Sequence, residues 1–189
     1  MTPEELIAFE ADIAREFDAG NIHAPVHLSG GNEQQLIDIF RDVKTTDWVC
    51  STWRSHYHAL LKGIPPAEVK RQIMAGRSMF ISSVEHRFLS SAIMGGMLPI
   101  ACGLAYAGAG ERVWVFVGDM CSWTGAYKDA RTYARGHSLD VHFVIEDNGL
   151  STNTPTVETW GLGESPPTLH YKYVRKYPHY QPLPGQHGF

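Results

Sequence analysis

The segment from residue 112 to residue 148 constrains the fold more than any other part of the chain. The run RVWVFVGD is apolar and β-rich and ends near a glycine, which is typical of a buried parallel strand. The stretch TGAYKDARTYARGH has helical character, and VHFVIEDN is typical of a second buried strand. A strand, a helix and a strand within about 37 residues predict a right-handed βαβ crossover. We therefore expect a three-layer α/β/α domain with a mostly parallel sheet.

Most of the other predicted elements are helices. Thr2 and Glu5 form a capping-box pattern at the start of a helix over residues 2–18. The sequence leaves open whether this helix is a packing element or an arm for a partner. Further helices are expected at about 33–43, 66–75 and 98–109, with a short apolar piece at 48–50 and an ordered loop at 77–96.

The composition changes near residue 164. Residues 165–189 contain five prolines, four tyrosines and no acidic residue, which is typical of an extended tail. We therefore predict one domain over residues 1–164, including the N-terminal helical arm, followed by this tail.

Charge and composition exclude several classes of protein. Lys and Arg number 16 and Asp and Glu 20, and no segment forms the basic stripe of a nucleic-acid binder. The three cysteines, Cys50, Cys102 and Cys121, are far apart and suggest a reduced compartment. The acidic N-terminus is unlike a targeting peptide, and the apolar stretch at 97–109 is too short to span a membrane. We therefore expect a cytoplasmic protein that contacts neither nucleic acid nor membrane.

Two polar residues follow the two strands of the predicted crossover. Asp119 comes after the first strand and Asn148, 29 residues later, after the second. Parallel neighbouring strands place both side chains at the same carboxyl edge, where open α/β sheets bind ligands. Oxygen donors of this kind suit Mg²⁺ or Ca²⁺, and a single acid predicts a metal that is bound together with a diphosphate. A helix that begins near Thr124 is expected to direct its N-terminus at the same anion. The alternative is that both residues are ordinary turn residues after strands.

The same residues carry a resemblance to a known family. GD, followed 29 residues later by N, is similar to the signature of thiamine diphosphate enzymes. The stretches VFVGDMCSWTGAYKDARTYA and VHFVIEDNGL resemble the α subunit of the E1 component of 2-oxo acid dehydrogenases. The upstream segments HLSGGNEQ, DWVCSTWRSHYHALLKG, GRSMF and IMGGMLPIACGLAYA follow the order of that family. The resemblance covers about His27 to Thr154 and implies the thiamine diphosphate-binding fold.

The resemblance implies roles for residues at matching positions. Asp119 and Asn148 would hold Mg²⁺ by their side chains, and Leu150 by its backbone carbonyl. Arg54, next to Trp53, would bind the diphosphate, since a guanidinium suits phosphate; a surface salt bridge is the alternative. The implied cofactor-binding set also includes Ala92, Met94, Gly118, Met120 and Cys121.

Met94, Met120 and His56 each carry an alternative or a departure from the family. Met94 would support the bent cofactor, although an ordinary core methionine is the alternative. Met120 stands where the family has glycine, and its backbone N–H donor requires a suitable φ. His56 matches a family histidine and is the candidate catalytic group, although an ordinary hydrogen-bonded histidine is the alternative. His58, two residues later, would not share a face with His56 on a helix but would do so on a strand.

The function implied is that of an α-like subunit of a thiamine diphosphate- and Mg²⁺-dependent enzyme that decarboxylates a small 2-oxo acid. A β-like partner would supply the pyrimidine-binding domain and the activating glutamate, and self-association would give an α2β2 heterotetramer. One alternative is a decarboxylase or carboligase without a lipoyl partner. Another is a degenerate, non-catalytic homologue, which Met120 favours.

Overall fold

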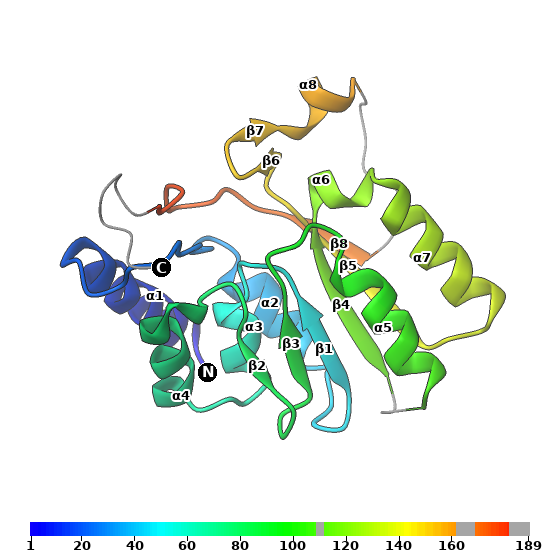
Figure 1. Ribbon diagram of the computed structural model, residues 1–189, viewed down its shortest axis with the longest axis horizontal. Helices are drawn as coiled ribbons and strands as arrows, with labels where there is room; N and C mark the ends of the chain where they lie inside the picture. The colour runs from blue at the N-terminus through cyan, green and yellow to red at the C-terminus, as the bar shows by residue number, and fades with distance from the viewer. Residues whose placement is uncertain (109–111, 162–168, 182–189) are drawn as a thin grey trace.

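A six-stranded sheet organises the computed structural model, which describes residues 1–108, 112–161 and 169–181. The strand order is β2-β3-β1-β4-β5-β8 (Figure 1). The strands are β1 (Trp48–Ser51), β2 (Ser82–Ser83), β3 (Phe88–Ser90), β4 (Val113–Gly118), β5 (Val141–Asp147) and β8 (Leu169–Lys172). All neighbours are parallel except β2 and β3, so the expectation of a mostly parallel sheet is confirmed.

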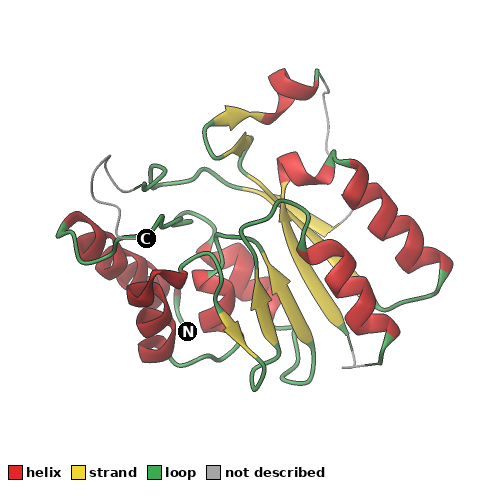
Figure 2. Ribbon diagram, viewed as in Figure 1, coloured by secondary structure: helices red, strands yellow, loops and turns green. Residues whose placement is uncertain are grey.

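Helices cover both faces of the sheet (Figures 1 and 2). One face packs against α1 (Pro3–Asp18), α2 (Glu33–Phe40), α3 (His56–Leu61), and α4 (Pro66–Gln72) with its π-helical extension η1 (Ile73–Arg77). The other packs against α5 (Met97–Tyr106) and α7 (Gly125–Gly136). Alternate residues of β4 enter the two cores, Phe116 on the α1 side and Val115 on the α5 side. This arrangement confirms the three-layer α/β/α architecture.

The predicted crossover is present. Strands β4 and β5 pair in parallel from Val113 opposite Val141 to Gly118 opposite Glu146, with α7 between them in the chain. Beyond β4 lies the short helix α6 (Asp119–Ser122), and beyond β5 lie the hairpin of β6 (Leu150–Ser151) and β7 (Thr154–Pro155) and the helix α8 (Thr156–Trp160). These pieces project past the carboxyl edge of the sheet (Figure 1).

Helix α1 is a packing element of this domain. The predicted capping box forms, because Thr2 Oγ1 accepts the Glu5 N–H and a Glu5 carboxylate oxygen accepts the Thr2 N–H. Leu6 and Ile13 are fully buried in the core beside α2 and α3. The apolar face of α1 is therefore covered by the chain itself.

Two expectations about local structure need correction. Residues 77–96, expected to be a loop, contain β2 and β3, which are too short to show a strand period. The segment 165–189, expected to be an extended tail, supplies β8 at the edge of the sheet. The domain boundary at residue 164 stays a prediction, and residues 182–189 lie outside the described part. Within the described ranges, every helix is too short or too polar to cross a bilayer.

Candidate functional site

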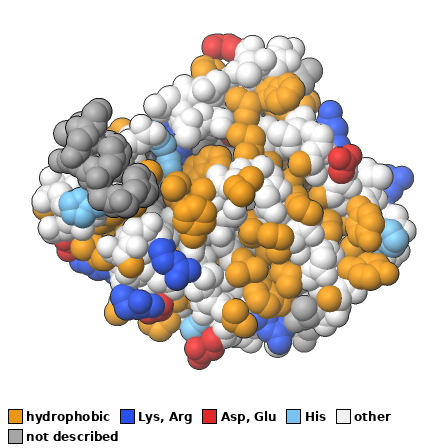
Figure 3. Space-filling view, in the orientation of Figure 1, with side chains coloured by type: hydrophobic (Ala, Val, Ile, Leu, Met, Phe, Trp, Pro, Cys, Tyr) orange, Lys and Arg blue, Asp and Glu red, His pale blue; other side chains and the backbone are white. Residues whose placement is uncertain are grey.

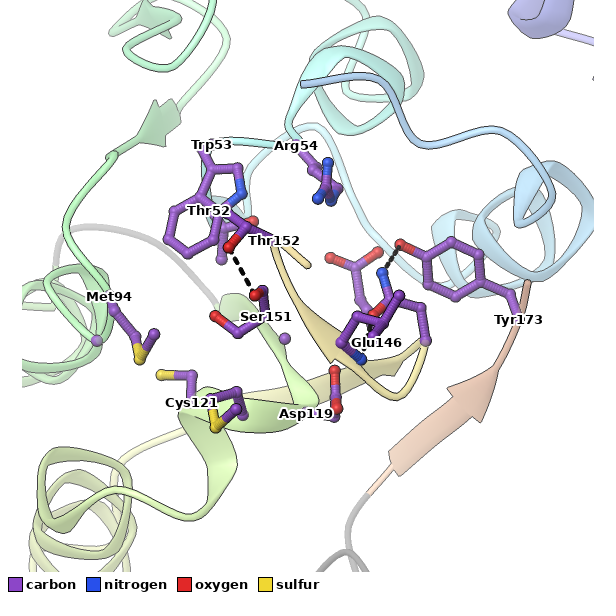
Figure 4. Close-up of a pocket in the computed structure, with 15 residues that line it drawn as sticks. Thr52, Trp53, Arg54, Met94, Asp119, Cys121, Glu146, Ser151, Thr152 and Tyr173 are labelled. Atoms are coloured by element: carbon purple, nitrogen blue, oxygen red, sulfur yellow. Dashed lines mark hydrogen bonds between the residues drawn. The ribbon is translucent and has the colours of Figure 1, made fainter. Parts of the chain in front are cut away.

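A pocket of about 500 Å³, including its open mouth, lies at the carboxyl edge of the sheet (Figure 4). It is lined by Thr52, Trp53, Arg54, Met94, Gly95, Gly118, Asp119, Met120, Cys121, Glu146, Asn148, Leu150, Ser151, Thr152 and Tyr173. Nine of the ten predicted cofactor-binding residues are among them, and Ala92 is not. The chain therefore brings together residues that are up to 97 positions apart, from Trp53 to Leu150.

Asp119 is a buried carboxylate at the floor of this pocket. It begins α6 directly after β4 and is 2% exposed. Neither carboxylate oxygen has a hydrogen-bond partner among the described residues. Burial raises the pKa of Asp119. The nearby Thr156 hydroxyl and Asn148 backbone oppose this shift only in part. The Thr156 hydroxyl oxygen has no hydrogen-bond partner within the described structure. A buried, unpaired carboxylate is costly, which favours a cation at this place.

Asn148 and Leu150, the other two proposed metal ligands, also line the pocket. The Asn148 Oδ1 accepts the Leu150 N–H at 2.9 Å, and its Nδ2 donates to the Tyr173 hydroxyl at 3.2 Å. An amide oxygen that accepts one N–H keeps a second lone pair for a ligand. Among the described residues no cluster of three or more His, Cys, Asp or Glu side chains forms a metal site. One carboxylate, one amide and one carbonyl are nevertheless the oxygen donors that Mg²⁺ accepts when phosphate and water complete its shell.

Arg54 supplies the positive charge of the pocket. It follows β1 and is only 8% exposed, so the alternative of a surface salt bridge is wrong. One of its nitrogen atoms donates to the Leu28 carbonyl at 3.4 Å, and the guanidinium forms no ion pair with a described residue. Burial lowers the pKa of Arg54, and the nearby carboxylate of Glu146 partly offsets this (Figure 4). A guanidinium with five donors and one used contact retains the capacity to bind an anion.

The short helix α6, and not α7, presents its first turn to the pocket. Helix α7 begins where predicted, since the Thr124 hydroxyl accepts the Tyr127 N–H, but none of its residues lines the pocket. Met120 lies in α6 and does not require positive φ, so its side chain is compatible with this backbone. Its sulfur accepts the Trp160 N–H from α8. Burial raises the pKa of Cys121 to about 11, so its thiol stays protonated at neutral pH.

Met94 lies on the wall of the pocket opposite the β5 end (Figure 4). Its side chain is 41% exposed, so the alternative of an ordinary core methionine is wrong. An apolar side chain at this place is available to contact a bound ring.

His56 lies outside the pocket. It is fully buried at the start of α3, where one ring nitrogen lies 2.9 Å from the Ser78 hydroxyl and the other 3.7 Å from the Glu10 carboxylate. Burial lowers the pKa of His56 to about 3, which leaves it neutral. These contacts are those of the hydrogen-bonded alternative, and we do not propose a catalytic role for it.

Six of the 15 pocket residues were not predicted from the sequence, and Glu146 and Tyr173 are two of them. Glu146 is 5% exposed, and its Oε1 accepts the Tyr171 hydroxyl at 2.5 Å and lies 3.3 Å from His58 Nε2. The strand alternation of β5 offered a signal, because Val144 faces the α1 side and Glu146 therefore faces it too. Tyr173 follows β8, whose place in the sheet the sequence did not reveal.

The sequence matches the model of the family described as "Dehydrogenase E1 component" over residues 2–161. The chain belongs to this family. The resemblance predicted for His27 to Thr154 is thereby confirmed.

Named members of the E1 family support the same assignment. The α subunit of the acetoin:2,6-dichlorophenolindophenol oxidoreductase of Cupriavidus necator is 31% identical over 160 residues, which cover 77% of this chain and 48% of that protein. The pyruvate dehydrogenase E1 component α subunit of Porphyra purpurea is 31% identical over 161 residues, which cover 74% of this chain and 47% of that protein. The chloroplastic pyruvate dehydrogenase E1 component subunit α-3 of Arabidopsis thaliana is 27% identical over 191 residues, which cover 86% of this chain and 45% of that protein. This E1 chain thus spans about half the length of the curated relatives it matches.

Proposed function

We propose that this chain is the α-like subunit of a thiamine diphosphate- and Mg²⁺-dependent enzyme that decarboxylates a small 2-oxo acid. The observation that carries the proposal is the unpaired, buried carboxylate of Asp119 in a pocket that also contains Asn148 and Arg54. The relatives are named as α subunits of pyruvate dehydrogenase E1 and of an acetoin oxidoreductase, which supports the reaction class.

The donor set fits the proposed cofactor at its diphosphate end. Asp119, Asn148 and the Leu150 carbonyl would hold Mg²⁺, and Arg54 would bind diphosphate oxygens. The first turn of α6 would donate backbone N–H groups from Met120 and Cys121 to the same anion. When bound, thiamine diphosphate supplies the electron sink for decarboxylation.

The aromatic and apolar wall of the pocket would contact the rest of the cofactor. Trp53 and Met94 lie on the side of the pocket away from Glu146 (Figure 4). Ala92 does not line the pocket, so its predicted contact with a ring requires a change of the 91–95 segment. Trp53 and Met94 would exclude water from around the bound ring.

A β-like partner is part of the proposal, as is self-association into an α2β2 assembly. The two carboxylates that line the pocket, Asp119 and Glu146, both lie at its diphosphate end, so the activating glutamate would come from the partner. Exposed apolar side chains gather on the face shown in Figure 3 and offer area for such a partner. Met94 lines the pocket, and its neighbour Ile93 and Ile100 of α5 are also exposed. A cytoplasmic location stays a prediction.

Calorimetry of thiamine diphosphate binding in Mg²⁺ tests the proposal. Asp119→Asn removes the negative charge with little change of shape, and we expect at least a 10-fold loss of affinity with an unchanged circular dichroism spectrum. Asp140→Asn is the matched control, because Asp140 precedes β5 at the opposite edge of the sheet and pairs there with His142. Unchanged affinity in Asp119→Asn would remove the metal assignment. No binding by the wild-type chain with its partner would favour the non-catalytic alternative.

The fate of the acyl group is tested separately. A 2-oxo acid dehydrogenase requires a lipoyl acceptor, whereas a decarboxylase or carboligase does not. Analysis of the products with and without an added lipoyl domain distinguishes them. An acyl-lipoyl product supports the dehydrogenase, and an aldehyde or hydroxyketone formed equally in both reactions supports the alternative.

A further inference from the structure

Residues 171–180 form an extended strap that continues from β8 across the carboxyl edge of the sheet (Figure 1). Odd-numbered residues from 171 to 179 are partly buried and the even-numbered residues from 172 to 178 are exposed. The strap ends beside α1, where the Tyr180 carbonyl accepts the Val26 N–H and the Tyr180 ring packs edge-on against Phe17. It therefore connects the last strand of the sheet with the first helix of the chain.

One inward side chain of the strap contacts a proposed metal ligand. Tyr173 lines the pocket, and its hydroxyl accepts a hydrogen bond from Asn148 Nδ2 at 3.2 Å (Figure 4). The opposite atom of the same amide, Oδ1, accepts the Leu150 N–H at 2.9 Å. The amide of Asn148 is thus held at both of its polar atoms.

We propose that Tyr173 is a positioning residue for Asn148, which fixes the amide so that its oxygen faces the metal; this inference rests on the proposed function. Without the hydroxyl, Nδ2 would lose its acceptor, and a 180° flip of the amide would place a nitrogen where Mg²⁺ requires an oxygen. The Leu150 N–H alone opposes that flip. Groups that orient a metal ligand typically change metal affinity by 10- to 100-fold.

The chemistry of Tyr173 agrees with this role. A phenol hydroxyl can accept an N–H through its oxygen while it carries no charge. Replacement of Tyr173 by phenylalanine removes only the hydroxyl and retains the packing of the aromatic ring. The contact is therefore testable by a single-atom change.

The test measures thiamine diphosphate binding by the chain, with its partner if binding requires it, at increasing Mg²⁺ concentration. For Tyr173→Phe we expect the half-saturating Mg²⁺ concentration to rise about 10-fold, with full thiamine diphosphate affinity restored at saturating Mg²⁺. Tyr177→Phe is the matched control, because Tyr177 belongs to the same strap and its ring packs against Gly30. We expect this control to retain the wild-type Mg²⁺ dependence.

Three results would overturn the inference. An unchanged Mg²⁺ dependence in Tyr173→Phe, while Asp119→Asn still loses binding, would remove the role of Tyr173 and leave the proposed function standing. Equal losses in Tyr173→Phe and Tyr177→Phe that excess Mg²⁺ does not restore would assign the effect to packing of the strap. An unchanged Mg²⁺ dependence in Asp119→Asn would remove the proposed metal set, and the role of Tyr173 with it. The melting temperature without ligand shows whether each variant remains folded.

Discussion

Replacement of Glu10 by glutamine should stabilise the protein increasingly as the pH rises from 6.5 to 8. Glu10 is fully buried in α1, where its two carboxylate oxygens accept the Ser29 N–H at 3.1 and 3.0 Å. Burial raises the pKa of Glu10 from 4.5 to about 8. The native state therefore keeps a proton that the unfolded chain releases above pH 4.5. The free energy of unfolding is unaffected below that pH, falls as the pH rises toward 8, and levels off above it.

The size of the effect follows from proton linkage. Whether Glu10 keeps its proton or ionises, its burial costs the native state about 3 kcal/mol at pH 6.5 and about 4 kcal/mol at pH 8. A glutamine does not ionise, so the variant should gain about 1 to 2 kcal/mol relative to wild type between these two pH values. Any difference in unfolding free energy between the protonated acid and the amide that does not depend on pH cancels from that comparison. Burial lowers the pKa of His56 to about 3. Its own contribution therefore changes mainly between pH 3 and 6.5, and it is common to wild type and variant.

Urea denaturation at several pH values between 6.5 and 8 measures this difference. Glu4→Gln is the matched control, since Glu4 lies exposed on the same helix and should show the same pH dependence as wild type. Unfolding free energies that run parallel for wild type and Glu10→Gln across the window would refute the raised pKa of Glu10.

Two further predictions concern the site. Arg54→Ala should weaken binding of thiamine diphosphate by at least 10-fold and binding of free thiamine much less, because only thiamine diphosphate carries the diphosphate. Calorimetry with both ligands measures the two losses of affinity. Equal losses would place Arg54 away from the phosphate. The purified chain should show no 2-oxo acid decarboxylation alone and should gain this activity with a partner that carries the pyrimidine-binding domain. A turnover rate of the isolated chain equal to that of the reconstituted complex would contradict the need for a partner.

The crossover from β4 to β5 could be predicted from sequence because both strands are buried on two faces. Such strands are continuous apolar runs, and their ends mark where polar side chains begin. Asp119 and Asn148 follow those ends, so their meeting at one edge follows from the parallel pairing alone. Trp53, Arg54 and Met94 were placed by the family resemblance, since spacing gives no reason for residues so far apart to converge.

The edges of the sheet could not be predicted in the same way. Strands β2 and β3 have two and three residues, which is too few to distinguish an alternating pattern from a polar loop. Strand β8 lies in a segment whose prolines and tyrosines favour an extended chain, and an extended chain becomes a strand only when a partner edge is available. Glu146 and Tyr173 were missed because one faces inward from the end of β5 and the other depends on β8.

The turn at residues 28–31 explains how α1, the pocket and the strap depend on one another. Within this turn, Ser29 N–H binds Glu10 of α1 and the Leu28 carbonyl accepts from Arg54 of the pocket. The carbonyl of Gly30 accepts the Lys176 N–H of the strap. Three contacts from three parts of the chain therefore meet on successive residues.

Glycine is required in this turn for two physical reasons. Gly30 and Gly31 have φ values of +56° and +103°, a region that disfavours side chains. A Cβ at Gly31 would lie 2.4 Å from the Val174 carbonyl oxygen, so any larger residue would push the strap outward. Val174 is the neighbour of Tyr173, whose hydroxyl contacts Asn148. The glycine pair of HLSGGN thus allows the strap to approach closely enough for Tyr173 to contact Asn148.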